Sequence, residues 1–299
     1  MIEVNKDMYL LNPFLEKRLD LPPAICQKGV YFGKVILSTI PIPNNNAADC
    51  FVMIWYSFGK LDFCKVGDKS WRCIDTSILN PSRRHKSCLT DAIFFEDKFY
   101  LVSVYGEIYA CDPNAKEPIL STHYERQNPS ARIFWHLMES GGELFGIMHD
   151  FFRKPDEERV KHIESLSNEG REDIYNRFHE YHRCWSWYKT CSFEVYKLSV
   201  SGCNSRFIKV DNLDGKAAFL GRNNSFTISN PSVFGYHGNR IYFSDDRYRS
   251  YGMNVFNMED GVFKPLYLTN SQLPKAPPIW GSLSNVIGFF DMPFYHAVV

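Results

Sequence analysis

A short unit that recurs at intervals in the mid-forties constrains the fold of this 299-residue chain more than any other feature of its sequence. In a full copy, a glycine precedes an aromatic residue in a short apolar stretch, and a polar turn and a second apolar stretch follow. Three copies contain Gly59, Gly106 and Gly252, and a fourth copy around Tyr196 lacks the glycine. Gly59 and Gly106 are 47 positions apart. This spacing is typical of a four-stranded β-propeller blade, because known blade repeats have roughly 40 to 50 residues.

Polar turns upstream of these copies predict a second hairpin in each unit. They lie between apolar stretches at Asp97–Lys98, Gly141–Gly142 and Gly238–Asn239. Gly, Asn and Asp adopt the positive φ angles that short hairpin loops require. Asp97 and Gly142 are 45 positions apart, but Gly142 and Gly238 are 96 apart. The longer interval indicates that one unit carries an insertion.

The repeats predict an all-β fold, a β-propeller of about five or six four-stranded blades with one helical insertion, in a single domain over residues 1–299. The high aromatic content of 16% agrees with many short strands. The expected units are 30–75, 91–121, 131–211 and 217–268, with a half unit at 8–21. A propeller removes its sheet edges by closing on itself. Either residues 277–299 complete the ring or the natural ring uses residues absent from this chain, and the half unit indicates truncation at the N-terminus.

Aromatic residues at blade positions are expected to form the core. Large flat side chains fill the wedge between neighbouring blades, and we assign them a role in stability only. These residues are Trp55, Tyr56, Tyr100, Tyr109, Phe243 and Phe256.

The insertion is expected at about residues 154–189. A stripe of apolar residues three or four positions apart predicts an amphipathic helix. The stripe consists of Ile174, Phe178, Tyr181, Trp185 and Tyr188. A shorter helix is expected to start at Pro155.

Ring closure does not require this insertion, so we expect it to supply part of a partner-binding surface. Trp187 lies off the apolar stripe, and an exposed Trp beside Arg183 has the composition of an interface hot spot. Arg183 and Trp187 are therefore the candidate partner-binding residues. The alternative is that the helix packs against the outside of its own blade.

Charge and hydropathy exclude several classes of function. The 34 basic residues balance 34 acidic residues, which disfavours nucleic acid or an acidic membrane surface as a partner. The longest apolar run, Cys50–Tyr56, is far shorter than the roughly 20 residues of a membrane-spanning helix. The first residues do not resemble a signal peptide, so we expect an intracellular protein of the cytoplasm or nucleus.

One cluster of potential metal ligands occurs within the insertion. It contains His179, His182 and Cys184, with Cys191 further along. On a helix Cys184 lies about 140° from His179, so their side chains diverge instead of converging on an ion. We expect no bound metal and no cofactor.

Acidic residues at the ends of predicted strands permit an alternative, enzymatic function. Asp112, Asp150, Asp245 and Asp246 would be the carboxylates of a carbohydrate-active propeller enzyme. Aspartate in this position more often forms a turn by accepting hydrogen bonds from nearby backbone N–H groups. We therefore expect no catalytic residues and favour a binding platform.

Five segments stand in an order and at separations that indicate a family. They are LLNPFLEKRLDLPP at 10–23, the block from Phe193 to Phe226, GNRIYFSDD at 238–246, NVFNMEDG at 254–261 and PPIW at 277–280. Together they resemble the KIB-type β-propeller domain that follows the F-box in a large group of plant F-box proteins.

The resemblance implies protein recognition. In such proteins the F-box binds the Skp1 adaptor of a cullin ubiquitin ligase, and the propeller holds the protein to be ubiquitinated. Residues 1–8 are too few for a helical F-box, so the resemblance implies that this chain does not bind Skp1. Residues 281–299 continue past the point where the family usually ends. A non-functional truncated paralogue is a further alternative.

Overall fold

The structure is a computed structural model of the chain. The residues that it describes are 3–12, 17–27, 32–39, 41, 49–56, 60–74, 89–115, 119–122, 132–154, 187–201, 204–221, 224–244, 253–266, 288–289 and 297–298.

These residues form five β-sheets, which we name A to E. Sheet A has the order β2 (Lys17–Gln27), β1 (Glu3–Asn12), β20 (Gly288–Phe289) and β21 (Ala297–Val298). Sheet B comprises β3 (Phe32–Leu37), β4 (Phe51–Tyr56), β5 (Leu61–Lys65) and β6 (Arg72–Ile74). Sheet C has the order β10 (Ile119–Thr122), β9 (Ile108–Cys111), β8 (Lys98–Ser103) and β7 (Leu89–Phe95).

Sheet D contains the two longest strands, and sheet E contains a parallel strand pair. Sheet D comprises β11 (Arg132–Ser140), β12 (Glu143–Lys154), β13 (Trp187–Ser201) and β14 (Asn204–Val210). Sheet E has five strands in the order β16 (Phe226–Ile228), β15 (Ala217–Leu220), β17 (Arg240–Ser244), β18 (Met253–Asn257) and β19 (Phe263–Pro265). A short 3₁₀ helix, η3 (Pro231–Phe234), precedes β17.

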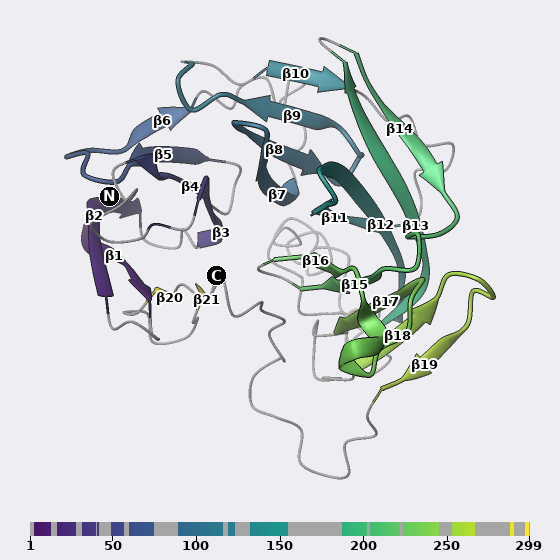
Figure 1. Cartoon of the computed structure of the whole chain (residues 1–299). Coiled ribbons are helices and arrows are strands. Elements are labelled where there is room, and N and C mark those ends of the chain that lie inside the picture. Colours follow the sequence, from purple (N-terminus) through teal and green to yellow (C-terminus); the bar gives the residue numbers. More distant parts are fainter. Residues whose placement is uncertain are drawn as a thin grey trace, which may run out of the picture.

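The five sheets follow one another around a common centre in chain order, which confirms the predicted propeller architecture (Figure 1). Four of the predicted units coincide closely with sheets B to E, and the half unit at 8–21 falls within β1 and β2. Sheet A combines both ends of the chain, because Leu11 of β1 pairs with Gly288 of β20. C-terminal residues thus supply two strands of sheet A, as in the first of the two predicted closures.

From sheet A to sheet E, each sheet packs face to face against the next one in the chain, and the strands alternate accordingly. In β4, Val52, Ile54 and Tyr56 belong to the cluster shared with sheet A, whereas Met53 belongs to the cluster shared with sheet C. Successive side chains of a strand point to opposite faces, so a strand buried on both faces reads as one apolar run. This arrangement explains the run Cys50–Tyr56.

The predicted core aromatics occupy these interfaces. Tyr56, Tyr100, Tyr109, Phe243 and Phe256 are buried, and Trp55 is half-buried. The clusters join consecutive sheets through pairs such as Leu10 and Val52 for A–B, Met53 and Phe99 for B–C, Val102 and Trp135 for C–D, and Ile147 and Phe243 for D–E.

A buried ion pair ties three consecutive sheets together. Asp91 of β7 is 3% exposed and forms an ion pair with Lys34 of β3. Its Oδ2 accepts a hydrogen bond of 2.7 Å from the backbone N–H of Leu137 in β11, and the Lys34 Nζ donates to the carbonyl of Ala92 at 2.8 Å. Burial raises the pKa of the Asp91 carboxyl, while Lys34 and the backbone donors oppose that rise. Sheets B, C and D therefore share one polar contact.

Two of the three predicted polar turns are hairpin turns. Gly141 and Gly142, with φ of 65° and 76°, join β11 to β12. The turn between β7 and β8 is shifted by one residue from the prediction, since Glu96 and Asp97 have the positive φ angles and Lys98 already pairs with Phe95.

The predicted hairpin at Gly238–Asn239 is wrong. β17 follows these residues but pairs in parallel with β15, and η3 lies in the crossover between them. Gly238 packs on the turn before β15, where a Cβ would lie 2.4 Å from the carbonyl oxygen of Gly215. The Asn239 side chain accepts hydrogen bonds from the backbone N–H groups of Leu213 and Gly215. Gly238 thus allows its backbone to lie close to the backbone of Gly215.

Replacing Gly238 with alanine is therefore expected to destabilise the chain. The new methyl group meets a backbone oxygen that cannot move alone, and overpacking of this kind costs about 1–3 kcal/mol. Urea denaturation measures the loss. Gly67→Ala is the control for space, because a Cβ at Gly67 contacts nothing within 4 Å. Gly67 has a φ of 95°, so this variant carries only the backbone strain of a positive φ. Equal stability of Gly238→Ala and the wild type would contradict the assigned contact.

The bounds of the predicted insertion need correction. β12 continues through Lys154, and β13 begins at Trp187 and includes Tyr188. Trp187 pairs with Lys154 across these two strands. The prediction that Tyr188 belongs to a helix is wrong, because the long β12–β13 pairing extends to that position. The rest of the predicted insertion, 155–186, lies outside the described residues.

Candidate partner-binding surface

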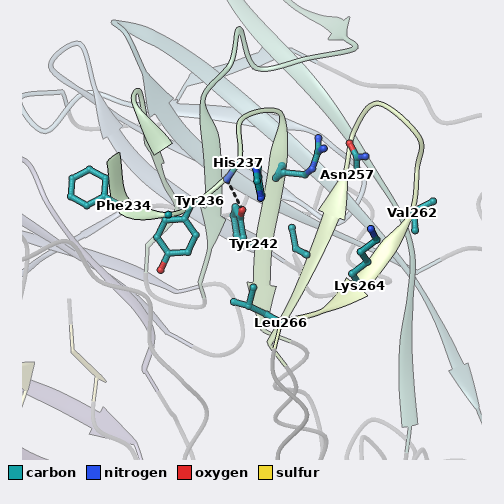
Figure 2. A pocket seen from close by; sticks show the side chains of 11 residues that line it. Phe234, Tyr236, His237, Tyr242, Asn257, Val262, Lys264 and Leu266 are labelled. Atoms are coloured by element: carbon teal, nitrogen blue, oxygen red, sulfur yellow. Dashed lines mark hydrogen bonds between the residues drawn. The ribbon is translucent and has the colours of Figure 1, made fainter. Parts of the chain in front are cut away.

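A pocket of about 580 Å³ opens on one face of sheet E. The opposite face of this sheet packs on sheet D through Ile241, Phe243 and Phe256. The walls of the pocket come from β17, β18 and β19 and from the end of η3 with the residues that follow it (Figure 2). We call this pocket and the exposed tip of η3 the sheet E surface.

A stack of aromatic rings forms the base beside the pocket. The Phe219 ring stacks on Phe226 and Tyr242 at centroid distances of 5.2 and 4.8 Å, with interplanar angles of 9° and 12°. Tyr236 meets the edge of Phe219 at 5.0 Å. Aromatic pairs of this kind contribute about 0.5–1.5 kcal/mol each beyond the burial of area. The base is therefore a rigid support for the residues above it.

The residues after η3 are fixed to this base by hydrogen bonds. Gly235, with φ of 76°, ends the 3₁₀ helix in the left-handed conformation that glycine adopts without strain. The Tyr236 N–H donates to the Pro231 carbonyl at 2.9 Å, and the backbone N–H of His237 donates to the Tyr242 hydroxyl at 3.0 Å (Figure 2). Tyr236 and His237 are thus held over the edge of the sheet.

The charged side chains that line the pocket are basic. They are Arg240 and Lys264, with the His237 ring beside them, and the lining contains no acidic residue. Arg240 forms an ion pair with Glu259 at 3.4 Å and donates to two backbone carbonyls. Lys264 is exposed and makes no ion pair within the described part of the chain. The exposed Lys264 ammonium is therefore a candidate to pair with a carboxylate of another molecule.

Large apolar side chains are exposed around the same pocket. Val233 and Phe234, at the end of η3, are 75% and 66% exposed, and Val262 at the turn before β19 is 43% exposed. Phe234 and Val262 also line the pocket, with Tyr236 and Tyr242 between them in Figure 2. Exposed apolar groups gathered at one place mark an interaction surface more often than scattered ones do.

The predicted partner-binding residues, Arg183 and Trp187, stay a prediction. Arg183 lies outside the described residues, and Trp187 is the first residue of β13 in sheet D. Sequence reasoning missed the sheet E surface. The available signal was the pair Val233–Phe234, two large apolar residues between Pro231 and Gly235 in a turn segment.

The other candidate sites have mixed outcomes. Asp112 accepts a hydrogen bond of 2.8 Å from the backbone N–H of Asn114, as expected for a turn former. Asp150 is a half-buried residue of β12. Asp245 and Asp246, like the potential metal ligands His179, His182 and Cys184, lie outside the described residues.

The described residues contain neither a metal-binding cluster nor a membrane-spanning helix. They hold no group of three or more His, Cys, Asp or Glu side chains that would bind a metal ion. Within the same ranges, no helix has the length and apolar character of a membrane span.

The fold and this surface define a β-propeller whose exposed features suit binding of another molecule. Residues 1–263 match the KIB1-4 beta-propeller family, and the chain belongs to that family. This match confirms the resemblance found in the five sequence segments.

A curated relative supports the same family. An Arabidopsis thaliana protein named as a putative F-box protein is 24% identical over 280 residues, which cover 87% of this chain. The chain spans 62% of the length of that relative. The name of this relative agrees with the association of the family with F-box proteins.

One solved structure aligns with the whole chain. It is PorZ, a surface component of the type-IX secretion system of Porphyromonas gingivalis, with 12% identity, a TM-score of 0.27 and 46% of its own length covered. A TM-score this low does not establish a shared fold.

Proposed function

We propose that this chain is the target-binding propeller of an F-box ubiquitin ligase subunit and that it is not itself an enzyme. The observation that carries the proposal is the family match over residues 1–263 together with the F-box name of the relative. The sheet E surface supports it, because exposed aromatic and large apolar residues gathered at one place are typical of interaction surfaces. The proposed setting is intracellular, where ubiquitin ligases act.

Recognition and ubiquitin transfer are separate tasks in this proposal. The propeller selects the target, and a helical F-box binds the Skp1 adaptor. We propose that residues 1–299 alone do not bind Skp1, because their described elements are strands and one short 3₁₀ helix. A pull-down with purified adaptor tests this point, and one-to-one binding would refute it.

Affinity capture tests the target-binding function. The tagged chain is expressed in plant cells, and the captured proteins are quantified against those of an unrelated five-bladed propeller. The proposal requires proteins that are specific to this chain, that bind it directly when purified, and that accumulate when its gene is deleted. A captured set that does not differ from the control would refute the proposal.

The predicted role of the insertion stays a prediction with its own test. We expect the double substitution Arg183→Ala and Trp187→Ala to reduce target capture several-fold, because hot-spot Arg and Trp residues contribute most of an interface's binding energy. The double variant Arg206→Ala and Trp71→Ala is the matched control, since both residues lie on other strands or turns of the propeller. Unchanged capture and an unchanged melting temperature would exclude the insertion as a recognition surface.

A further inference from the structure

The charges of the sheet E surface are one-sided in a chain that is neutral overall. The whole chain has 34 Lys and Arg residues against 34 Asp and Glu residues, but the pocket is lined by Arg240 and Lys264 and by no acidic side chain. Arg240 is already paired with Glu259, so its charge is largely balanced within the sheet. The local positive potential thus centres on Lys264 and favours a negatively charged ligand group.

The apolar features of the surface set the second requirement for a ligand. Phe234 stands exposed at one side of the pocket, and Val262 and Leu266 line it near Lys264 (Figure 2). An apolar side chain of a ligand would cover these residues and remove their surface from water. The lining therefore suits a molecule that carries an acidic and an apolar group close together.

The aromatic base and its hydrogen bonds order the sheet E surface before a ligand binds. Tyr236 packs on Phe219, and the His237 backbone is hydrogen-bonded to Tyr242. A surface that is already ordered loses little conformational entropy when a ligand binds. These contacts therefore hold the backbone from Gly235 to His237 in place.

We propose that the sheet E surface binds a linear segment of the target protein in which an Asp or Glu lies next to an aromatic or large aliphatic residue. The carboxylate pairs with Lys264, and the apolar side chain packs between Phe234 and Leu266. This inference rests on the proposed function and names the kind of target segment that it selects.

The observations favour a peptide over a nucleic acid. Nucleic-acid sites have many basic residues that follow a phosphate backbone, so their affinity depends on several charges. Here one unbalanced lysine stands beside apolar side chains, which matches the mixed composition of a peptide groove.

Peptide selection tests the proposal directly. The probe is a phage-displayed library of random linear peptides, which is panned on the purified full chain. Selected peptides are then synthesised, and their affinity is measured by fluorescence anisotropy. We expect an acidic residue beside Phe, Trp or Leu in the selected sequences, and affinity that weakens as salt rises, because salt screens the carboxylate–lysine attraction.

Charge reversal at Lys264 tests whether this side chain pairs with the peptide carboxylate. Lys264→Glu is expected to weaken peptide binding by about 10-fold or more, because glutamate repels the peptide carboxylate, and Lys264→Arg is expected to retain binding, because it keeps the positive charge. Lys98→Glu is the matched control, an exposed lysine at the start of β8 in sheet C, and its affinity should equal that of the wild type. Melting curves of all three variants confirm that each is folded.

Several results would overturn the inference. These are selected peptides without acidic residues, equal peptide affinity of Lys264→Glu and the wild type, or tight binding of a single-stranded DNA oligonucleotide that Lys264→Glu abolishes. Target capture from cells that is unaffected by Lys264→Glu would overturn the pocket inference and leave the proposed function standing. Failure of the wild type to capture any specific target would overturn the proposed function itself.

Discussion

Replacing Asp91 with alanine is expected to lower the free energy of unfolding by about 3–5 kcal/mol, because removing one partner of a buried ion pair leaves the other charge uncompensated. The partner is Lys34, whose side chain is 8% exposed. The substitution also removes the acceptor for the backbone N–H of Leu137. One change therefore weakens the contact among sheets B, C and D at once, and urea denaturation followed by circular dichroism measures the loss.

Two further variants make this prediction specific. Asp20→Ala removes the carboxylate of an exposed ion pair with Arg18, and exposed pairs contribute less than about 1 kcal/mol. Lys34→Met in the Asp91→Ala background is expected to recover part of the stability, because it removes the unpaired ammonium. A loss below about 1 kcal/mol for Asp91→Ala would show that the pair is not the inter-sheet contact described above.

Replacing Trp135 with alanine is expected to cost about 3–5 kcal/mol, the range for deleting a large aromatic side chain from a core. Trp135 of β11 is fully buried between sheets C and D. Its ring stacks on Phe207 at a centroid distance of 5.0 Å and contacts Tyr196 at 5.6 Å. These rings lie over Gly146, where a Cβ would come within 2.9 Å of Phe207. Because the structure around a deleted core side chain relaxes only partly, the cavity adds to the cost of the lost burial.

Circular dichroism during thermal and urea unfolding measures this effect without relying on tryptophan emission. Trp71→Ala is the matched control, because Trp71 is half-buried and donates one hydrogen bond to the Pro22 carbonyl at 2.7 Å. We expect the control to lose clearly less stability than Trp135→Ala. Similar losses for the two variants would contradict the assignment of Trp135 to the C–D interface core.

The propeller was predictable because its signals are local and repeated. Each blade requires short apolar strands, tight turns and buried aromatics, and these leave a period that can be read along the chain. Gly141 and Gly142 form a hairpin turn from their own conformational preference alone. Periodic local features of this kind do not depend on distant contacts.

The errors in sheets D and E arose where distant contacts decide the structure. Gly238–Asn239 has the composition of a hairpin turn, but its packing against Gly215 sets a crossover and a parallel strand pair. Tyr188 fits the predicted helical stripe as well as it fits a strand, and only its pairing with Arg153 of β12 assigns it to β13. When a short segment suits both a helix and a strand, the segments that it packs against decide its secondary structure.

The sheet E surface could not be predicted for a similar reason. Its basic residues, Arg240 and Lys264, are on different strands, and Phe234 comes from η3. Spacing along the sequence gives no sign that these residues meet on one face. The pair Val233–Phe234 in a turn was the one local sign of an exposed apolar site.

Hydrogen–deuterium exchange with and without a captured target tests most directly the claim that this propeller binds its target through sheet E. The comparison uses the purified full chain, and each segment is followed by mass spectrometry. Our account expects slower exchange on target binding in residues 233–237 and 253–266, with no change in sheet B. Slower exchange confined to residues 155–186 or to sheets A to C would contradict it.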